Sequence, residues 1–462
     1  MQKCLIISFD FPKSEYPKTS YAIACILAKF SKKNIADIEH CQYNLKPYVF
    51  GTPKNEIEKK IGDNFKENYV PKLNDYSFIA LSAYAWSENL VNFIIEMIRP
   101  NFRGKIILGG YEITALSKEK LEIIYPNVDF YVKDYVEKSL ELIFKNETTD
   151  KIIDIKPDVK DFVSPYLSGI LPLNTKKIHW ESKRGCIFHC DFCEWGKATN
   201  NMIRISDRRI DQEIELFKQN NIQEINVLDA TFLICKDDIT TLKKLLSIPS
   251  CKINLQMHFS PIKNEIGSEF LDICQKHKDR ISLEFGLQTI HETEMKILNR
   301  KNNLEQVKSV MKELKERDII YEISIIFGIP SQTVETFKKT IEFIEENGCK
   351  KFCAFPLRLP QNSKMAEQRK ELKIKEIQDK SFSLNFVNES YSFSNSDWET
   401  MYQIADDYAK VPLCGDPIEA MKPVIDKIAR IYIYGGLHSR FREYRNENTC
   451  RNNNNVSIFW RL

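Results

Sequence analysis

The sequence predicts an α/β protein made of two successive units, each with a parallel sheet, followed by a small, mostly helical region. Short apolar runs alternate with amphipathic stretches over residues 1–150. The alternation stops over the polar, proline-containing residues 151–176 and resumes over 177–365. Strands that alternate with helices are typical of parallel sheets, so we expect two units joined by a linker.

The first unit is expected to be a doubly wound, Rossmann-like sheet. Residues 76–82 (YSFIALS) form a continuous apolar run of the kind found in a parallel strand that is covered on both faces. The expected strands are 5–8, 76–82, 105–108 and 129–132, and the expected helices are 20–32, 88–98 and 136–145. This order of elements is typical of nucleotide-binding and related folds.

The second unit repeats a strand and a helix about six times. Its expected strands are 177–180, 224–228, 252–256, 281–286, 321–326 and 351–355. Polar residues follow these strands where each one ends. The remaining residues, 366–462, show helical spacing at 398–408 and 420–434.

Composition limits the class of protein. A length of 462 residues suits two or three domains, and a formal net charge of +3 leaves no overall polyanion-binding footprint, so no nucleic-acid partner is expected. The 13 cysteines are odd in number and mostly scattered, which favours a reducing compartment. No apolar stretch is long enough to span a bilayer, and the apolar run at the N-terminus is too short for a signal peptide. We therefore expect a cytoplasmic protein with no membrane span.

Three cysteines lie in one short segment after the strand at 177–180. Cys186, Cys190 and Cys193 have the spacing C-x3-C-x2-C. Three thiolates are one fewer than a closed iron–sulfur or structural zinc site uses, and an open coordination position distinguishes reactive metal sites from structural ones. Zinc, with His189 or a distant cysteine as fourth ligand, is the alternative. However, His189 is adjacent to Cys190 in the sequence, and no second paired-ligand motif is present.

This spacing, with Phe192 just before the third cysteine, closely resembles the signature of the radical S-adenosylmethionine (radical SAM) superfamily. The resemblance implies a [4Fe-4S] cluster on the three cysteines, with SAM chelating the open iron. It further implies a partial (β/α)6 TIM barrel over 177–365, whose chemistry lies at the carboxyl ends of the strands. The resemblance also implies that residues 366–462 cover the substrate site. Reductive cleavage of SAM would give a 5′-deoxyadenosyl radical that abstracts hydrogen from a substrate. The partners implied are a small-molecule or peptide substrate and an electron donor such as flavodoxin or ferredoxin.

Other strand ends resemble SAM-binding motifs of the same superfamily. The resemblance implies that Asp229 contacts the SAM amino group and that Phe192 packs at the adenine. The sequence Glu284-Phe-Gly-Leu-Gln288, followed by Arg300, resembles a pair of motifs near the ribose and carboxylate of SAM. A carboxylate suits a ribose diol and an arginine suits a carboxylate, so Glu284, Gln288 and Arg300 are expected to position SAM.

Two further residues are candidates for handling the substrate. His258 follows the third strand of the second unit and could face its cavity, although a lone histidine is more often packed or solvated. Cys353, near the last strand end, could donate a hydrogen atom to a substrate radical, although a buried cysteine is usually unreactive.

The first unit resembles the cobalamin-binding domain that precedes many radical SAM cores. The likeness lies in residues 81–86, 107–112 and 129–132, and it places Ser82, Gly109 and Gly110 at the corrin and its nucleotide. Glycine permits such close approach. The chain departs from that family in having no Asp-x-His-x-x-Gly after the first strand and no histidine before His40. A sheet retained without cofactor is therefore the alternative.

These observations leave three functions open. With cobalamin, the chain is expected to be a C-methyltransferase. Without it, the chain would be an epimerase, dehydratase or cross-linking enzyme acting on a peptide or natural product. The third alternative is an iron–sulfur scaffold protein without catalysis.

Overall fold

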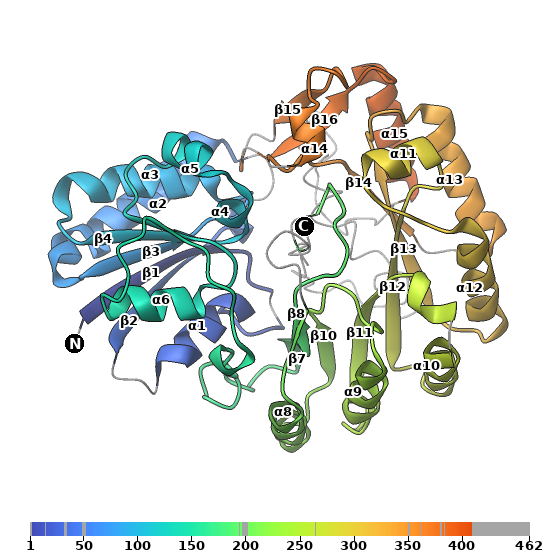
Figure 1. Cartoon of the computed structure of the whole chain (residues 1–462), viewed down its shortest axis with the longest axis horizontal. Helices are drawn as coiled ribbons and strands as arrows, with labels where there is room; N and C mark the ends of the chain where they lie inside the picture. Colours follow the sequence, from blue (N-terminus) through green and yellow to red (C-terminus); the bar gives the residue numbers. More distant parts are fainter. Residues whose placement is uncertain are drawn as a thin grey trace.

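The computed structural model contains two parallel-sheet units that stand side by side (Figure 1). It describes residues 2–13, 15–31, 35–48, 52–193, 195, 202–263, 265–349, 352–361, 363–378, 381–382 and 384–408. The expected helix at 420–434 lies outside these ranges. The first unit is on the left of Figure 1, the second on the right, and a few short C-terminal elements lie above them.

The sheet of the first unit has six parallel strands in the order β2-β1-β3-β4-β5-β6. Their bounds are β1 (Gln2–Asp10), β2 (Ala36–Asn44), β3 (Phe78–Ser82), β4 (Lys105–Gly109), β5 (Phe130–Val132) and β6 (Ile152–Ile153). The predicted doubly wound sheet is confirmed. Because the strand order reverses between β1 and β3, the crevice at the carboxyl ends of these two strands is where such a sheet binds a ligand.

Helices cover both faces of this sheet. They are α1 (Tyr21–Ser31), α2 (Lys54–Asn68), α3 (Glu88–Ile98), α4 (Tyr111–Ala115), α5 (Lys118–Ile124) and α6 (Val136–Phe144). Apolar side chains of α2 and α3 form a core on one face, and those of α1 and α6 form a core on the other. β2 was not expected from the sequence, because this edge strand is half-exposed and its residues (ADIEHCQYN) are mostly polar.

The segment 151–176 is packed against both units rather than extended between them. Ile152 and Ile153 form β6 and pair with β5, which extends the first sheet beyond residue 150. Farther along, Phe162, Tyr166 and Leu171 belong to the core of the second unit. The prolines of this segment interrupt helix and strand periodicity, so the sequence pattern does not indicate that the segment is packed.

The second unit is an open barrel of six parallel strands in the order β14-β13-β12-β11-β10-β7. Their bounds are β7 (Lys177–Trp180), β10 (Glu224–Val227), β11 (Lys252–Met257), β12 (Ile281–Gln288), β13 (Tyr321–Phe327) and β14 (Phe352–Pro356). Within this sheet each inner strand pairs with the strands before and after it in the chain, and the edge strands β7 and β14 each pair with one neighbour. The predicted partial (β/α)6 barrel is confirmed.

Amphipathic helices surround this barrel. They are α8 (Asp207–Gln219), α9 (Lys236–Leu246), α10 (Glu265–Lys276), α11 (Glu292–Ile297), α12 (Leu304–Glu316) and α13 (Val334–Glu346). Side chains of Ser206, Asn303 and Thr333 cap the N-termini of α8, α12 and α13. Each cap satisfies a backbone N–H that would otherwise lack a partner, so these helices begin at defined residues.

The described C-terminal elements follow β14 and lie at the top of Figure 1. They are α14 (Lys364–Glu367), the antiparallel pair β15 (Lys375–Gln378) and β16 (Asn385–Glu389), and α15 (Asn395–Tyr408). Trp398 of α15 packs on Phe327 at the end of β13, and Phe382 joins the core of the first unit. The region therefore contacts both units.

Contacts between side chains fix the two units together. The Tyr16 hydroxyl donates a 3.0 Å hydrogen bond to Glu224 of β10, and its ring stacks on His179 of β7 with centroids 4.5 Å apart. On α1, Tyr21 accepts a 3.1 Å hydrogen bond from Arg209 of α8. As a result, the carboxyl ends of the first sheet face the barrel.

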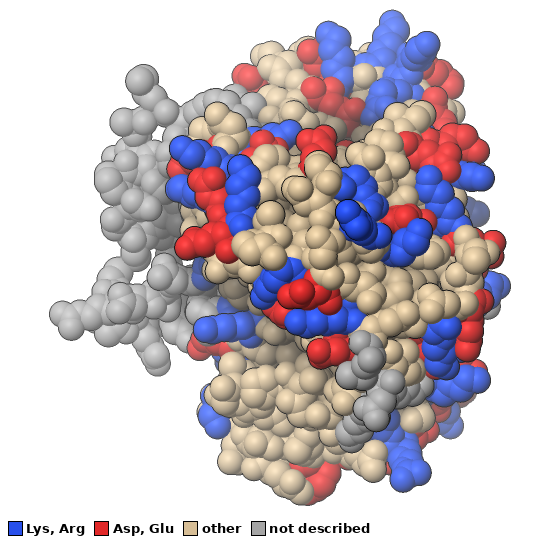
Figure 2. Space-filling model, turned by 90° about the vertical axis from the view of Figure 1, so that its left-hand side faces the viewer, with Lys and Arg blue, Asp and Glu red and all other residues tan. Residues whose placement is uncertain are grey.

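Charge is mixed over the outer face of the first unit. Figure 2 shows lysine and arginine interspersed with aspartate and glutamate on that face. Within the described ranges, no helix has the length and apolarity needed to cross a bilayer.

Candidate functional site

The three cysteines lie on the wall of one cavity at the carboxyl end of the barrel. Cys186, Cys190 and Cys193 line it together with Phe192, which the sequence analysis placed beside SAM. Cys186 and Cys190 are buried, Cys193 is partly exposed, and none of the three takes part in a disulfide. The loop that carries them follows β7 and the short strand β8 (Lys183–Arg184).

Buried charges hold the start of this loop. Asp229, at the end of β10, accepts hydrogen bonds from the backbone N–H of Ser182 at 2.8 Å and of Lys183 at 3.2 Å. The Lys183 ammonium lies 3.2 Å from Asp229 and 2.7 Å from Asp238. Since all three charged side chains are almost completely buried, their geometry is fixed by mutual pairing.

Asp229 therefore has a different place from the one expected. It is fully buried and does not line the cavity. Its contact with the SAM amino group stays a prediction, and what the structure shows is that its carboxylate positions the cysteine loop.

The thiols suit a multi-iron cluster. Burial raises the pKa of Cys186, so a bound cation is what would hold this thiol as thiolate. Within the described ranges, no three His, Cys, Asp or Glu side chains converge on a point that a single metal ion could occupy. In a [4Fe-4S] cube each thiolate binds a different iron, so three cysteines can hold a cluster and leave one iron open.

Arg300 joins the cysteine loop to the rest of the cavity. Its Nη1 donates to Cys190 Sγ at 3.5 Å, and its Nη2 donates to the carbonyl of Gly286. The Arg300 side chain is buried, and its Nε has no hydrogen-bond partner in the described part of the chain. A buried donor without a partner is costly, so this atom points to a ligand.

Two more predicted residues line the same cavity. Glu284 accepts a 3.1 Å hydrogen bond from Ser324. Gln288 is buried in a left-handed conformation, with φ +65°, and its Oε1 lacks a partner among the described residues. Glu284, Gln288 and Arg300 thus line the same cavity as the cysteines, and two of them have polar atoms without a partner among the described residues; their role in positioning SAM stays a prediction.

His258 lines this cavity but is already engaged. Its ring stacks on Phe188, with centroids 4.2 Å apart, and its Nδ1 accepts a 3.0 Å hydrogen bond from the backbone N–H of Ser260. Burial and, to a lesser degree, the Arg300 charge lower the pKa of His258 to about 3. The ring is therefore neutral near pH 7, and its role in handling the substrate stays a prediction.

Cys353 lies away from the cavity. Its thiol donates a 2.9 Å hydrogen bond to Glu322, and its side chain is not part of the cavity wall. Burial and the neighbouring carboxylates raise its pKa well above that of an ordinary cysteine. Hydrogen-atom donation by this thiol stays a prediction that its placement does not support.

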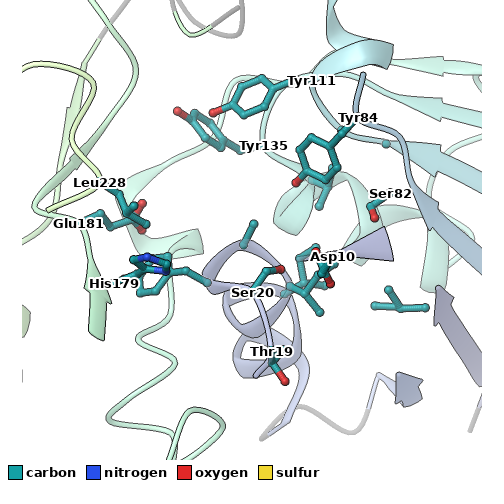
Figure 3. A pocket seen from close by; sticks show the side chains of 18 of the residues that line it. Asp10, Thr19, Ser20, Ser82, Tyr84, Tyr111, Tyr135, His179, Glu181 and Leu228 are labelled. Carbon is teal, nitrogen blue, oxygen red and sulfur yellow. The ribbon is translucent and has the colours of Figure 1, made fainter. Parts of the chain in front are cut away.

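A second, larger cavity, of about 290 Å³, lies between the two units; we call it the cleft. On the side of the first unit it is lined by residues at the carboxyl ends of the strands, among them Asp10, Ser82, Gly109 and Gly110. Figure 3 shows Asp10 and Ser82 across the cleft from His179, Glu181 and Leu228 of the second unit. The cleft thus occupies the crevice that the strand order predicts.

The cleft has features that a large polar ligand would use. Ser82 is buried, and its Oγ has no hydrogen-bond partner in the ranges described. Asp134, after β5, has an Oδ1 with no hydrogen-bond partner among the residues that the structure describes, and burial raises its pKa to about 7. At Gly110, with φ +117°, a Cβ would lie 2.3 Å from the carbonyl oxygen of Ala83, so the turn tolerates only glycine. Ser82 and Gly110 are among the residues that the resemblance implied for cobalamin, whereas Asp134 is not, and their contact with cobalamin stays a prediction.

Aromatic residues that the sequence analysis did not select complete the cleft. Tyr84, Tyr111 and Tyr135 lie together along one side of it (Figure 3). Each follows the end of a strand in the first sheet, and that position is the signal that would have identified them. Trp195, on the cysteine loop, lies 5.7 Å from Tyr111 between ring centroids.

The two cavities share part of their walls. Trp195 and Glu284 line both the cleft and the cysteine cavity. A molecule bound between them would touch the contents of both. This shared wall is the central geometric feature of the site.

Comparisons with known proteins agree with this description. Residues 180–344 match the family model described as the radical SAM superfamily. TokK of Streptomyces tokunonensis, described as a cobalamin-dependent radical SAM methyltransferase, is 26% identical over 212 residues, which cover 42% of this chain and 30% of TokK. The 2-(S-pantetheinyl)-carbapenam-3-carboxylate methyltransferase of Streptantibioticus cattleyicolor is 21% identical over 312 residues, covering 60% of this chain and 46% of that protein. The matched parts thus span less than half of each relative.

A solved structure shares the fold over nearly the whole chain. The radical SAM methyltransferase TsrM of Kitasatospora setae, with tryptophan and a SAM analogue bound, superposes with a TM-score of 0.65 at 14% identity. The match covers 96% of this chain and 99% of TsrM. Another structure of TsrM holds cobalamin and a [4Fe-4S] cluster. At this identity the likeness shows the fold.

The contact between Arg300 and Cys190 predicts a change in cluster potential. Replacing Arg300 with lysine keeps the charge but removes the guanidinium donor to Sγ. Because hydrogen bonds to the cysteine sulfurs favour the reduced cluster, the potential should fall by about 50 mV, less than one tenfold change for a single electron. Redox titration followed by electron paramagnetic resonance (EPR), without SAM, measures it.

Arg358 provides the matched control. It lines the same cavity but pairs with Glu112, at 3.3 Å. Arg358→Lys should leave the potential within error of the parent protein. Equal shifts in the two variants would show that the Arg300 bond to Cys190 does not influence the cluster.

Proposed function

We propose that this chain, a member of the radical SAM superfamily, methylates a carbon of a small-molecule or peptide substrate with cobalamin as the methyl carrier. The observation that carries the proposal is the wall shared by the cleft and the cysteine cavity. A substrate held there would lie within reach of both cofactors. Such proximity is what a two-cofactor reaction needs.

The bound groups supply the reactive chemistry: SAM on the cluster supplies a 5′-deoxyadenosyl radical that takes a substrate hydrogen, and cobalamin supplies the methyl group. The residues of this chain would hold the cluster, SAM and cobalamin in place. Cys186, Cys190 and Cys193 would hold the cluster and leave one iron open for SAM. Arg300 and Gln288 would receive polar groups of SAM through their unpaired atoms.

The cleft supports the cobalamin part of the proposal. Ser82 and Asp134 offer oxygens that have no partner among the described residues, and Gly110 keeps the turn after β4 packed tightly on Ala83 at the wall of the cleft. No histidine lines the cleft on the side of the first unit within the described ranges; His179 is on the barrel side. We therefore infer that cobalamin binds here through its periphery and not through a histidine from the first unit.

Two relatives favour methylation over the alternatives. TokK and the carbapenam methyltransferase are both described as methyltransferases, and TokK as cobalamin-dependent. An epimerase, dehydratase or cross-linking enzyme would need the cysteine cavity but not a cleft equipped with unpaired polar atoms. The electrons would come from a donor such as flavodoxin or ferredoxin, and we place the reaction in the cytoplasm.

Product accounting tests the reaction. In anaerobic turnover with a candidate substrate, each methylated product should appear with one S-adenosylhomocysteine and one 5′-deoxyadenosine, because one SAM provides the methyl group and another the radical. Quantitative mass spectrometry measures all three. Deoxyadenosine with no S-adenosylhomocysteine, from protein loaded with cobalamin, would favour an epimerase or dehydratase instead.

Binding of cobalamin can be tested without the substrate. Ser82→Ala should weaken hydroxocobalamin binding about fivefold, the effect expected when one hydrogen bond is lost. Equilibrium dialysis with absorption spectra gives the Kd. Ser139→Ala is the control, since Ser139 is equally buried and also has an unpartnered Oγ in the described chain, but lies on α6 outside the cleft. A Ser82 variant that binds as tightly as the Ser139 variant would remove Ser82 from the site.

A further inference from the structure

A buried charge cluster joins the two units beside the cysteine loop. The Nε and Nη2 atoms of Arg184 both lie 2.8 Å from Glu181 Oε1, and its Nη1 lies 2.6 Å from Glu137 Oε1. Arg184 is two residues before Cys186, whereas Glu137 belongs to the first turn of α6 in the first unit. One guanidinium thus links the cysteine loop to the other unit.

Aromatic rings enclose this guanidinium. Its carbon lies 4.0 Å from the ring centroid of Phe162 and 5.1 Å from that of Tyr135. All three charged side chains are at least nine-tenths buried. In such surroundings a charge pair is stronger than in water and has few alternative geometries. A small displacement of Glu137 is therefore passed on to Arg184 through the ion pair.

This link forms part of the wall of the cleft. Glu137, Glu181 and Arg184 line the cleft together with Tyr135, and Figure 3 shows Tyr135 and Glu181 there. A Cβ on Gly109 would lie 3.0 Å from Val136 Cγ1, so the β4 turn packs tightly on the start of α6. The backbone N–H of Asp134 donates a 2.9 Å hydrogen bond to Thr114 of α4. The turns that a ligand in the cleft would contact are therefore packed against the residues that carry Glu137.

We propose that Arg184 is a positioning residue that makes the geometry of the cysteine loop depend on the first unit. Glu137 and Tyr135 hold the Arg184 guanidinium in place, and this fixes the position of the backbone just before Gly185 and Cys186. Filling the cleft then strengthens SAM binding at the cluster, and SAM strengthens binding in the cleft by the same factor, because coupling between two sites is reciprocal. The identity of cobalamin as the ligand in the cleft rests on the proposed function.

The test compares two glutamates on one helix. Glu141 is one turn after Glu137 on α6 and is similarly buried, but it pairs with Lys29 of the first unit at 3.3 Å. Glu137→Gln and Glu141→Gln thus remove the same charge from the same helix. Each variant is reconstituted with iron and sulfide, and the Kd of SAM is measured by equilibrium dialysis with and without hydroxocobalamin. EPR spectra of the reduced cluster are recorded with SAM present.

In the parent protein, hydroxocobalamin should lower the Kd of SAM at least fivefold, within the usual range of coupling between sites. Glu137→Gln should raise the Kd of SAM about tenfold without hydroxocobalamin, alter the EPR signal with SAM, and reduce the coupling factor to about one. Glu141→Gln should keep the parent values. Glu137→Asp, which retains the charge, should restore part of the affinity, and it replaces Glu137→Gln if that variant does not fold.

Equal SAM affinities and equal spectra in the two glutamine variants would overturn the proposal. A parent protein that binds hydroxocobalamin with no effect on SAM would also overturn it, while leaving the proposed function intact. If the parent binds no hydroxocobalamin, the proposed function fails. The measurements without cobalamin then decide: a loss confined to Glu137→Gln supports the role of Arg184, and equal losses reject it.

Discussion

The carboxyl edges of two parallel sheets face each other in this protein, and the rest of the site depends on that arrangement. Parallel sheets collect their loops at one edge, and loops are where binding groups can vary without disturbing the core. The contacts of Tyr16 and Tyr21 with the second unit bring the two edges together. The cleft and the cysteine cavity then share a wall that neither unit could form alone.

Buried charge fixes the loop that lies between the two edges. Ser182, Lys183 and Arg184 are consecutive, and buried carboxylates hold all three. These are Asp229, Asp238 and Glu181 of the second unit and Glu137 of the first. Buried pairs of this kind contribute little net stability, but loss of one partner costs about 3–5 kcal/mol. Their effect here is to give the residues before Cys186 one conformation.

The sequence was most informative where local pattern decides structure. The barrel strands are apolar runs at regular intervals, and the cysteine spacing is contained in eight residues, so both could be predicted. The edge strand β2 and the packing of 151–176 depend on neighbours distant in the chain. The site shows the same division. Gln288 and Arg300 belong to recognisable local motifs, so they could be selected from the sequence. The pairing of Arg184 with Glu137, 47 residues away, exists only once the two units are docked.

The central claim is that the two cofactor sites are adjacent across the wall formed by Trp195 and Glu284. The most direct measurement is the relaxation rate of the cob(II)alamin EPR signal in protein loaded with cobalamin and cluster, recorded with the cluster oxidised and then reduced. The cob(II)alamin signal should relax faster when the reduced, paramagnetic cluster is present, because magnetic dipoles interact strongly only at short range. Identical relaxation in the two states, with both centres fully loaded, would contradict the central claim.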